Sequence, residues 1–207
     1  MRKDMEPDLH KEELRKRILN TAMEQFTSHG IRSVKMDSIA KLLGISKRTL
    51  YETYPNKEQL LLECVKLYEE QYDIHMSEYS NEPSHDVIDI ISEFYRQQMK
   101  NLSDVNPAFF SDIERYKSVR EFFDEKHGER KNKVDYFFKR GISEGLFRGD
   151  LDYNIVSNIA MSSIDHVMKS RMYEQQDITY ILHNIMSLYF GGICTKSGLE
   201  RLRHFKG

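Results

Sequence analysis

Cysteine is scarce in this chain, and the long apolar runs of secreted or membrane proteins are missing. Cys64 and Cys194 are the only cysteines, and they lie far apart without CxxC spacing. This argues against a disulfide framework and for a reducing compartment. Charged residues follow Met1 directly, so we expect no secretory signal. No stretch approaches the roughly 20 apolar residues that span a bilayer. We therefore expect a cytoplasmic protein.

The residue patterns of common catalytic and metal sites are also missing. The eight histidines are scattered, and none shows the HxxxH or HExxH spacing that places two imidazoles on one helix face. There is no GxSxG turn for a serine nucleophile and no glycine-rich phosphate loop. We therefore expect no catalytic residues, no bound metal and no cofactor, and a protein that is not an enzyme.

Strand-like alternation and internal repeats are absent, whereas apolar residues recur at helical spacing along most of the chain. The 207 residues are 39% hydrophobic and 31% charged, so the chain can bury a core and remain soluble. We predict an all-α protein of about nine helices, with a small N-terminal head and a larger helical body. Residues 1–10 are expected to form a flexible arm, and residues 11–29 an amphipathic helix.

The charges are distributed unevenly between the two ends of the chain. The overall charge is −2, which by itself does not favour a nucleic-acid binder. Residues 1–60, however, hold twelve Lys or Arg and nine Asp or Glu, a net of +3, which leaves −5 for the remainder. A mildly basic head on an acidic body suits a protein that presents one end to DNA.

The segment from Met36 to Lys57 predicts two short helices joined by a tight turn. Apolar residues at positions 39, 40 and 43 form one face of a first helix. Gly44 follows the last of them and is the usual kind of helix stop. Ser46 then caps a second helix over residues 47–54, because its hydroxyl can accept a hydrogen bond from a backbone N–H of the first turn.

The second of these helices has the character of a DNA-reading helix. With Leu50 facing the core, Arg48 and Glu52 point outward, and Thr49 and Tyr51 flank them. A short capped helix with Lys and Arg at its exposed start suits the major groove. Arginine can bind both acceptors of a guanine edge, and free N–H groups at a helix start favour phosphate.

This segment resembles the helix-turn-helix of the TetR family of transcriptional regulators. The matching residues are Ile39-Ala40, Gly44-Ile45-Ser46, Thr49-Leu50-Tyr51 and Tyr54-Pro55-Asn56-Lys57. The resemblance covers roughly the first quarter of the chain, and the rest matches the family only in length and helical pattern. It implies a DNA-binding domain over residues 1–57 and a ligand-binding and dimerisation domain over residues 58–207.

The resemblance also implies a function and a set of partners. We expect a sequence-specific regulator, usually a repressor, that binds a double-stranded operator as a homodimer. A small apolar or amphipathic ligand in the body would release it. The alternative is a DNA-binding structural or interaction protein whose body binds a protein partner and no small molecule.

Seven residues are expected to contact DNA: Lys35, Ser46, Lys47, Arg48, Thr49, Tyr51 and Lys57. Arg48 has the best claim to a base edge, whereas Tyr51 and Lys57 resemble phosphate contacts of the family, which position the protein without specifying sequence. Glu52 either accepts from a cytosine or only balances charge. Lys35 stands near the place where the family commonly has a Thr or Ser cap, whose hydroxyl often contacts a phosphate. In this chain a cation would make that contact.

Two features of the expected body bear on how it works. A helix that begins at Lys57 and runs to about Tyr79 connects the head to the body. A charged helix from about Ser118 to Glu144 loses its apolar stripe near residues 127–131, which indicates either a kink or an exposed middle turn.

The last two long helices are apolar on two faces. The first starts after Asp152 or Asn154 and the second after Asp177, each a suitable cap. One apolar face can cover the core of the body, and the other needs a partner. In the family that the head resembles, such helices form a dimer interface.

The body is rich in Phe, Tyr and Met, which at helical spacing are usually core residues. The resemblance implies that some of them border a ligand pocket. The candidates are Phe94, Met99, Phe110, Phe122, Phe138, Met161, Asp165 and His166. Asp165 and His166 form a polar pair in a mostly apolar helix, so they either anchor a ligand or are satisfied locally at the interface.

Overall fold

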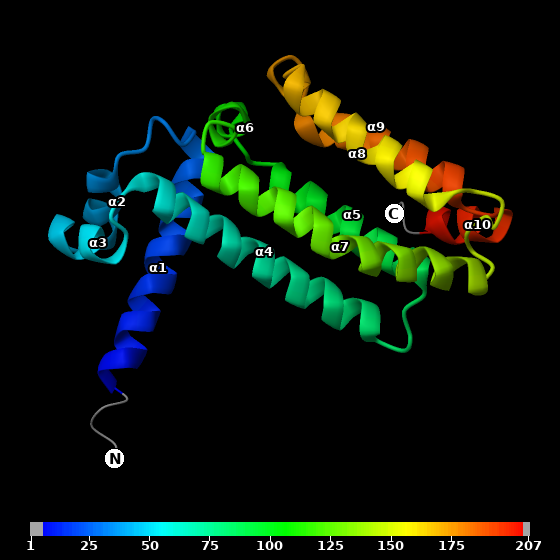
Figure 1. Ribbon diagram of the computed structural model, residues 1–207, viewed down its shortest axis with the longest axis horizontal. Coiled ribbons are helices and arrows are strands. Elements are labelled where there is room, and N and C mark those ends of the chain that lie inside the picture. Colours follow the sequence, from blue (N-terminus) through cyan, green and yellow to red (C-terminus); the bar gives the residue numbers. More distant parts are fainter. Residues whose placement is uncertain (1–5, 205–207) are drawn as a thin grey trace. The chain divides into compact units, whose positions relative to one another are not determined.

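The computed structural model describes the backbone of residues 6–204, and over this range the protein is all-α. The predicted fold class is confirmed (Figure 1). The helices are α1 (Glu6–His29), α2 (Met36–Leu43), α3 (Lys47–Thr53), α4 (Lys57–Asn81), α5 (Val87–Leu102), α6 (Pro107–Ile113), α7 (Lys117–Ser143), α8 (Tyr153–Lys169), the short 3-10 helix η1 (Met172–Glu174), α9 (Ile178–Ile193) and α10 (Lys196–His204).

The chain forms two compact units. The first contains the chain up to residue 72 together with residues 105–123, and the second contains residues 73–104 and everything from residue 124 onward. The first unit therefore includes α6 as well as α1, α2 and α3. The functional boundary expected after residue 57 falls at the first residue of α4 and stays a prediction.

One expectation about helix limits needs correction, and one alternative in α7 can be compared with the structure. Helix α1 begins at Glu6, so the arm expected over residues 1–10 is helical in its second half, and residues 1–5 lie outside the described residues. Helix α7 is one continuous helix from Lys117 to Ser143, through the place where the sequence predicts either a kink or an exposed middle turn. Gly128 and Glu129 are exposed, which agrees with the alternative of an exposed middle turn.

The core of the first unit is made by the stripe of α1 and the inward faces of α2, α3 and α4. Ile18, Ala22 and Phe26 of α1, four residues apart, are completely buried, as the spacing of one helix face requires. Leu50 of α3 is also completely buried. Cys64 lies in this core with its thiol against the carbonyl oxygen of Leu19 at 3.4 Å. Burial raises the pKa of this thiol to about 12, so it is a packing residue with no thiolate at neutral pH.

The core of the second unit joins the start of α5 to the end of α9. Its buried residues are Val87, Ile88, Ile91, Phe147, Ile193 and Cys194. Side chains of α10 pack on this cluster, and so does Phe138, which also stacks on Tyr153 with ring centroids 4.2 Å apart.

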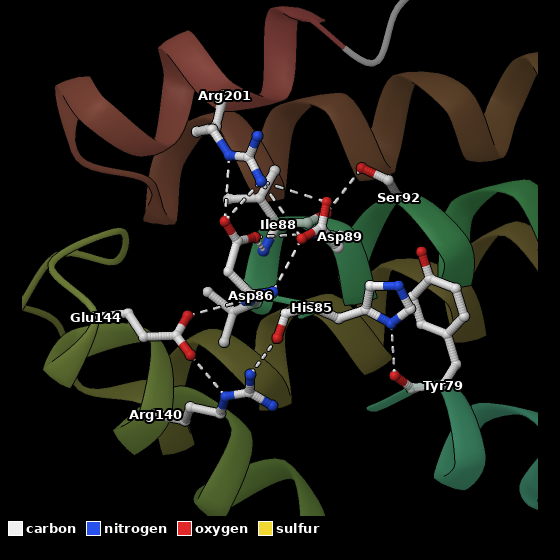
Figure 2. Close-up of polar contacts among 10 residues, drawn as sticks. Tyr79, His85, Asp86, Ile88, Asp89, Ser92, Arg140, Glu144 and Arg201 are labelled. Carbon is white, nitrogen blue, oxygen red and sulfur yellow. Dashed lines mark hydrogen bonds and ion pairs between the residues drawn. The ribbon is translucent and has the colours of Figure 1, made fainter. Parts of the chain in front are cut away.

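Two arginines fasten the turn between α4 and α5 to the rest of the second unit (Figure 2). Arg201 of α10 donates to a carboxylate oxygen of Asp86 at 2.9 Å, and Asp86 also caps α5. Arg140 of α7 donates to the carbonyl oxygens of Ser80, at 3.0 Å, and of His85. These contacts hold the turn at both ends.

Helices α8 and α9 run alongside each other in the second unit (Figure 1). Asp152 caps α8, accepting from the Asn154 N–H at 2.9 Å, and Asp177 caps α9, accepting from the Thr179 N–H at 2.8 Å. Several large apolar side chains on these helices remain exposed in the single chain: Ile155, Ile159, Met161, Tyr180 and Leu188. The expected second apolar face is therefore present. Among the described residues, no helix combines the length and apolar composition that a membrane span requires.

Candidate nucleic-acid interface

The turn between α2 and α3 is built as the sequence predicts. Gly44 adopts the left-handed conformation with φ of 67°, which costs a glycine little because it has no Cβ. The Ile45 N–H then donates to the Ala40 carbonyl oxygen at 3.1 Å, so the end of α2 is closed by its own backbone.

Ser46 starts α3 in the predicted way. Its hydroxyl oxygen accepts from the Thr49 N–H at 3.0 Å, and the two hydroxyl oxygens of Ser46 and Thr49 lie 2.8 Å apart. Leu50 is completely buried and fixes the rotation of α3. Arg48 and Glu52 therefore lie on the opposite side of the helix, Tyr51 lies at its flank, and Lys47 lies at its exposed start; all four are exposed.

Helix α3 holds two cations that are paired with carboxylates, and Arg48 is the more exposed of them. Its side chain is 87% exposed, and its Nε donates to a carboxylate oxygen of Glu52 at 2.7 Å. This contact uses Nε and leaves the terminal nitrogens as further donors, which is the pair that a guanine edge requires. Glu52 thus supports Arg48 in the structure of the free protein.

Lys47 is paired across the turn with Asp37 of α2. The hydrogen bond that Lys47 donates to the Asp37 carboxylate raises the pKa of the Lys47 ammonium, so this side chain is charged at neutral pH. Lys35 occupies the cap position of α2 and makes no side-chain capping bond. Its backbone carbonyl accepts from the Ser38 N–H at 3.0 Å, and its side chain is exposed. Both lysines can therefore reach an anion outside the head.

Lys57 has a different environment from the other six candidates. Its ammonium donates to the carbonyl oxygens of Ile31 at 2.9 Å and Arg32 at 3.3 Å. Burial lowers its pKa. Local sequence patterns do not reveal these partners, because they lie 25 or more residues earlier in the chain. The expected contact of Lys57 with a phosphate stays a prediction. In the structure the same ammonium is already bound to backbone carbonyl oxygens.

The eight ligand-pocket candidates are divided between the two compact units, and their pocket stays a prediction. Phe110 and Phe122 belong to the first unit and the other six to the second. Met161, Asp165 and His166 are exposed on α8 in the single chain. Asp165 pairs with Lys169 one helical turn away, at 3.0 Å, so the alternative of local satisfaction fits it better than that of a buried anchor.

Two polar contacts in the second unit escaped the sequence-based reasoning. The Tyr95 hydroxyl lies 2.7 Å from Nδ1 of His183, next to an edge-on contact between the rings of Phe94 and Phe190. Both contacts join α5 to α9. A tyrosine beside a phenylalanine on α5 was the only available signal, and it does not identify the partner helix.

The second contact that the sequence does not reveal is made by the carboxylate of Glu93. Its side chain is 5% exposed and accepts hydrogen bonds from Arg96 at 2.7 Å and Gln97 at 2.7 Å, with His75 Nε2 at 2.5 Å. Burial alone would raise the pKa of Glu93, but these three hydrogen bonds outweigh burial and lower it to about 2. The carboxylate is therefore ionised throughout the neutral range.

The segment that contains this interface is similar to a known protein family. Residues 18–64 match the family model described as bacterial regulatory proteins, tetR family. This segment extends from the middle of α1 to the first turns of α4, and so contains the whole of the helix-turn-helix. The chain is 22% identical over 184 residues to the fatty acid metabolism regulator protein of Bacillus subtilis (strain 168). This match covers 86% of this chain and 95% of that protein.

Solved structures show the same fold over nearly the whole chain. A transcriptional regulator from Saccharomonospora viridis in complex with choline is 18% identical, with a TM-score of 0.68, and the match covers 89% of this chain and 100% of that one. The regulator FadR from Bacillus subtilis in complex with stearoyl-CoA is 21% identical, with a TM-score of 0.59, over 86% and 98% of the two chains.

Proposed function

The chain belongs to the TetR family of transcriptional regulators, and from this premise we propose that it is a homodimeric repressor that a small amphipathic ligand releases from its operator. The observation that carries the DNA-binding part is the capped start of α3. There Lys47, Arg48 and Tyr51 are all exposed, with Arg48 opposite the buried Leu50 and Tyr51 at the flank.

Within the proposed interface the residues have different roles. Arg48 reads a base edge, because its guanidinium is exposed and keeps its terminal nitrogens as donors. Lys35, Lys47 and Tyr51 bind phosphates, as do the hydroxyls of Ser46 and Thr49 at the start of α3, where backbone N–H groups also favour an anion. The phosphate contacts set the register of the protein on the duplex, and Arg48 supplies sequence preference.

The proposed dimer forms through α8 and α9. Ile155 and Ile159 lie four residues apart on α8, and Tyr180 and Leu188 lie eight apart on α9, so each pair shares one helix face. All four are more than half exposed in the single chain, Leu188 at 73%. A contiguous apolar face of this kind is stabilised when a second copy covers it.

The proposed ligand is amphipathic, by analogy with a protein of the same fold that is solved in complex with stearoyl-CoA; another protein of this fold is solved in complex with choline, a small cation. The half-buried aromatic and polar contacts between α5 and α9, at Phe94 and Tyr95, are the place where such a molecule would change the packing of the body. Release follows if the ligand binds more tightly to a dimer whose two reading helices no longer match successive major grooves, about 34–36 Å apart. The ligand shifts the balance only by this difference in affinity.

The proposal can be tested without knowing the operator in advance. A random-sequence duplex library is selected with the purified protein, and the enriched duplex is compared with an unrelated duplex of equal length. We expect a palindromic site and tighter binding of that site. Stearoyl-CoA, shorter acyl-CoAs and choline are then added separately, and we expect one of these classes both to raise the melting temperature and to release the duplex. Enrichment of no sequence would contradict the regulator. A palindrome with no ligand effect would contradict only the release.

A further inference from the structure

The turn between α1 and α2, residues 30–35, determines where the helix-turn-helix begins. Ile31 is completely buried and Val34 is 7% exposed, so both side chains anchor the turn in the core of the first unit. Gly30 has a φ of 80°, and a Cβ added there would lie 2.9 Å from the Cβ of Ala108. The first residue of the turn is thus packed directly against α6.

A buried carboxylate on α6 holds the backbone of this turn. Asp112 is 6% exposed, and its Oδ2 accepts from the Arg32 N–H at 2.8 Å. Asp112 lies in the last turn of α6, where a negative charge is disfavoured by the helix dipole. A buried carboxylate in that place needs a compensating contact, and the Arg32 N–H supplies it.

Lys57 holds the same peptide group from its other side. The carbonyl of Ile31 and the N–H of Arg32 belong to one peptide unit, and the Lys57 ammonium binds that carbonyl oxygen at 2.9 Å. A cation at the oxygen and an anion at the N–H both match the direction of the peptide dipole. The charge of Asp112 also opposes the lowering of the Lys57 pKa by burial. The peptide unit therefore lies between two opposite charges that come from α4 and α6.

We propose that Lys57 and Asp112 are positioning residues for DNA binding, which fix peptide 31–32 and thereby the start of α2, and that Lys57 does not bind a DNA phosphate. The inference rests on the proposed DNA-binding function. It assigns to Asp112, which lies outside the helix-turn-helix, a role in presenting that motif. It also replaces the phosphate contact that the sequence pattern suggests for Lys57.

The two possible roles of Lys57 differ in the salt dependence of binding. A lysine that neutralises a phosphate contributes about 0.9 to the slope of log K against log salt, whereas a positioning residue contributes nothing. Lys57→Met keeps the apolar stem and removes the charge. We expect it to weaken the selected duplex and the unrelated duplex by a similar factor of about ten, since a smaller fraction of the molecules holds α2 in place. The salt slope should be unchanged.

Control variants make this comparison specific. Lys47→Met removes an exposed lysine of α3 and should lower the slope by about 0.9. Asp112→Ala should reproduce the loss seen with Lys57→Met, and the double variant should lose little more than either single one, because the two residues act on one peptide unit. Asp124→Asn removes an exposed carboxylate of α7 and should bind like the wild type.

Hydrogen exchange gives a readout that does not depend on DNA. The Arg32 amide should exchange faster in Lys57→Met and Asp112→Ala, while the amides of α9 should keep their protection and show that the body remains folded. A decrease of the salt slope in Lys57→Met would overturn the inference, and so would unchanged protection of Arg32 in both variants. Failure of the wild type to bind any duplex would instead refute the proposed function, and the exchange experiment would still decide whether the two residues hold the turn.

Discussion

At the scale of single residues, exposure and pairing separate the side chains that can contact DNA from those that shape the head. Arg48 and Lys47 each have one acidic partner and remain largely exposed, 87% and 67% for their side chains. Exposed pairs of this kind contribute little to stability, so both cations are available to a ligand. Lys57, by contrast, is partly buried against backbone carbonyls.

Substitution of Arg48 should change sequence preference more than stability. Arg48→Ala is expected to weaken the selected duplex by about 1–3 kcal/mol, the value of one bidentate base contact, and to affect an unrelated duplex much less. Lys47→Ala is the comparison, because a phosphate contact should be lost equally on both duplexes. Titration of the two duplexes at one salt concentration measures the difference. Equal losses for Arg48→Ala would show that Arg48 does not read a base.

Glu93 makes the stability of the body dependent on acid. Its folded pKa of about 2 lies below the value of 4.5 for an unperturbed glutamate. Its contribution is therefore complete above about pH 4.5 and is lost as the pH falls toward 2. Glu93→Gln should lower the free energy of unfolding at pH 7 by about 1–3 kcal/mol and should flatten the dependence below pH 4.5. Denaturant titrations at several pH values test this. Asp165→Asn, which removes an exposed pair, should change neither quantity, and an acid dependence that survives in Glu93→Gln would assign it to other carboxylates.

At the scale of elements, the helices whose ends carry local signals were predicted closely from the sequence. Gly44, Ser46 and Asp177 act through groups two to five residues away, so the sequence alone reveals them. The same reasoning could not find the partners of Lys57 or the contact of Tyr95 with His183, because these join residues 25 to 88 positions apart. The early start of α1 was missed because Pro7 and polar neighbours suggested an arm, although proline is tolerated in the first turn of a helix.

The cap of α3 offers a test at this scale. Ser46→Ala should destabilise the head by about 1 kcal/mol, because the Thr49 N–H loses its acceptor. Ser46→Asp should restore most of the stability and still bind DNA poorly, since a carboxylate caps the helix but repels phosphate. Ser38→Ala, at an exposed position inside α2, is the control and should be close to neutral. Thermal unfolding and duplex binding measured on the same samples separate the two effects, and recovery of both by Ser46→Asp would contradict a phosphate near the cap.

At the scale of the whole molecule, the exposed apolar face of α8 and α9 is the feature that a single chain does not explain. Surface helices of a soluble protein seldom leave a leucine 73% exposed beside a tyrosine 62% exposed and isoleucines at 57% and 53%. The first compact unit contains the helix-turn-helix, and the second contains α8 and α9.

Dimerisation is tested by placing a charge on this face. Leu188→Glu should weaken self-association more than a hundredfold, since an unpaired buried charge costs about 3 kcal/mol or more. Sedimentation should then give the mass of one chain, 24.6 kDa, where the wild type gives about twice that value. Tyr136→Glu introduces the same charge at an equally exposed site on α7 and should leave the dimer intact. A wild type that sediments as a single chain would refute the proposed interface.

The exposure of Leu188 and its neighbours has a consequence for gene dosage. If only the pair of chains spans both halves of an operator, the concentration of the pair that can bind DNA follows the square of the amount of protein whenever most chains are single. Halving the amount of protein in such a cell would then reduce the concentration of the pair to about one quarter. The apolar surface of two C-terminal helices would in this way set how sharply the controlled genes respond to the number of copies of their regulator.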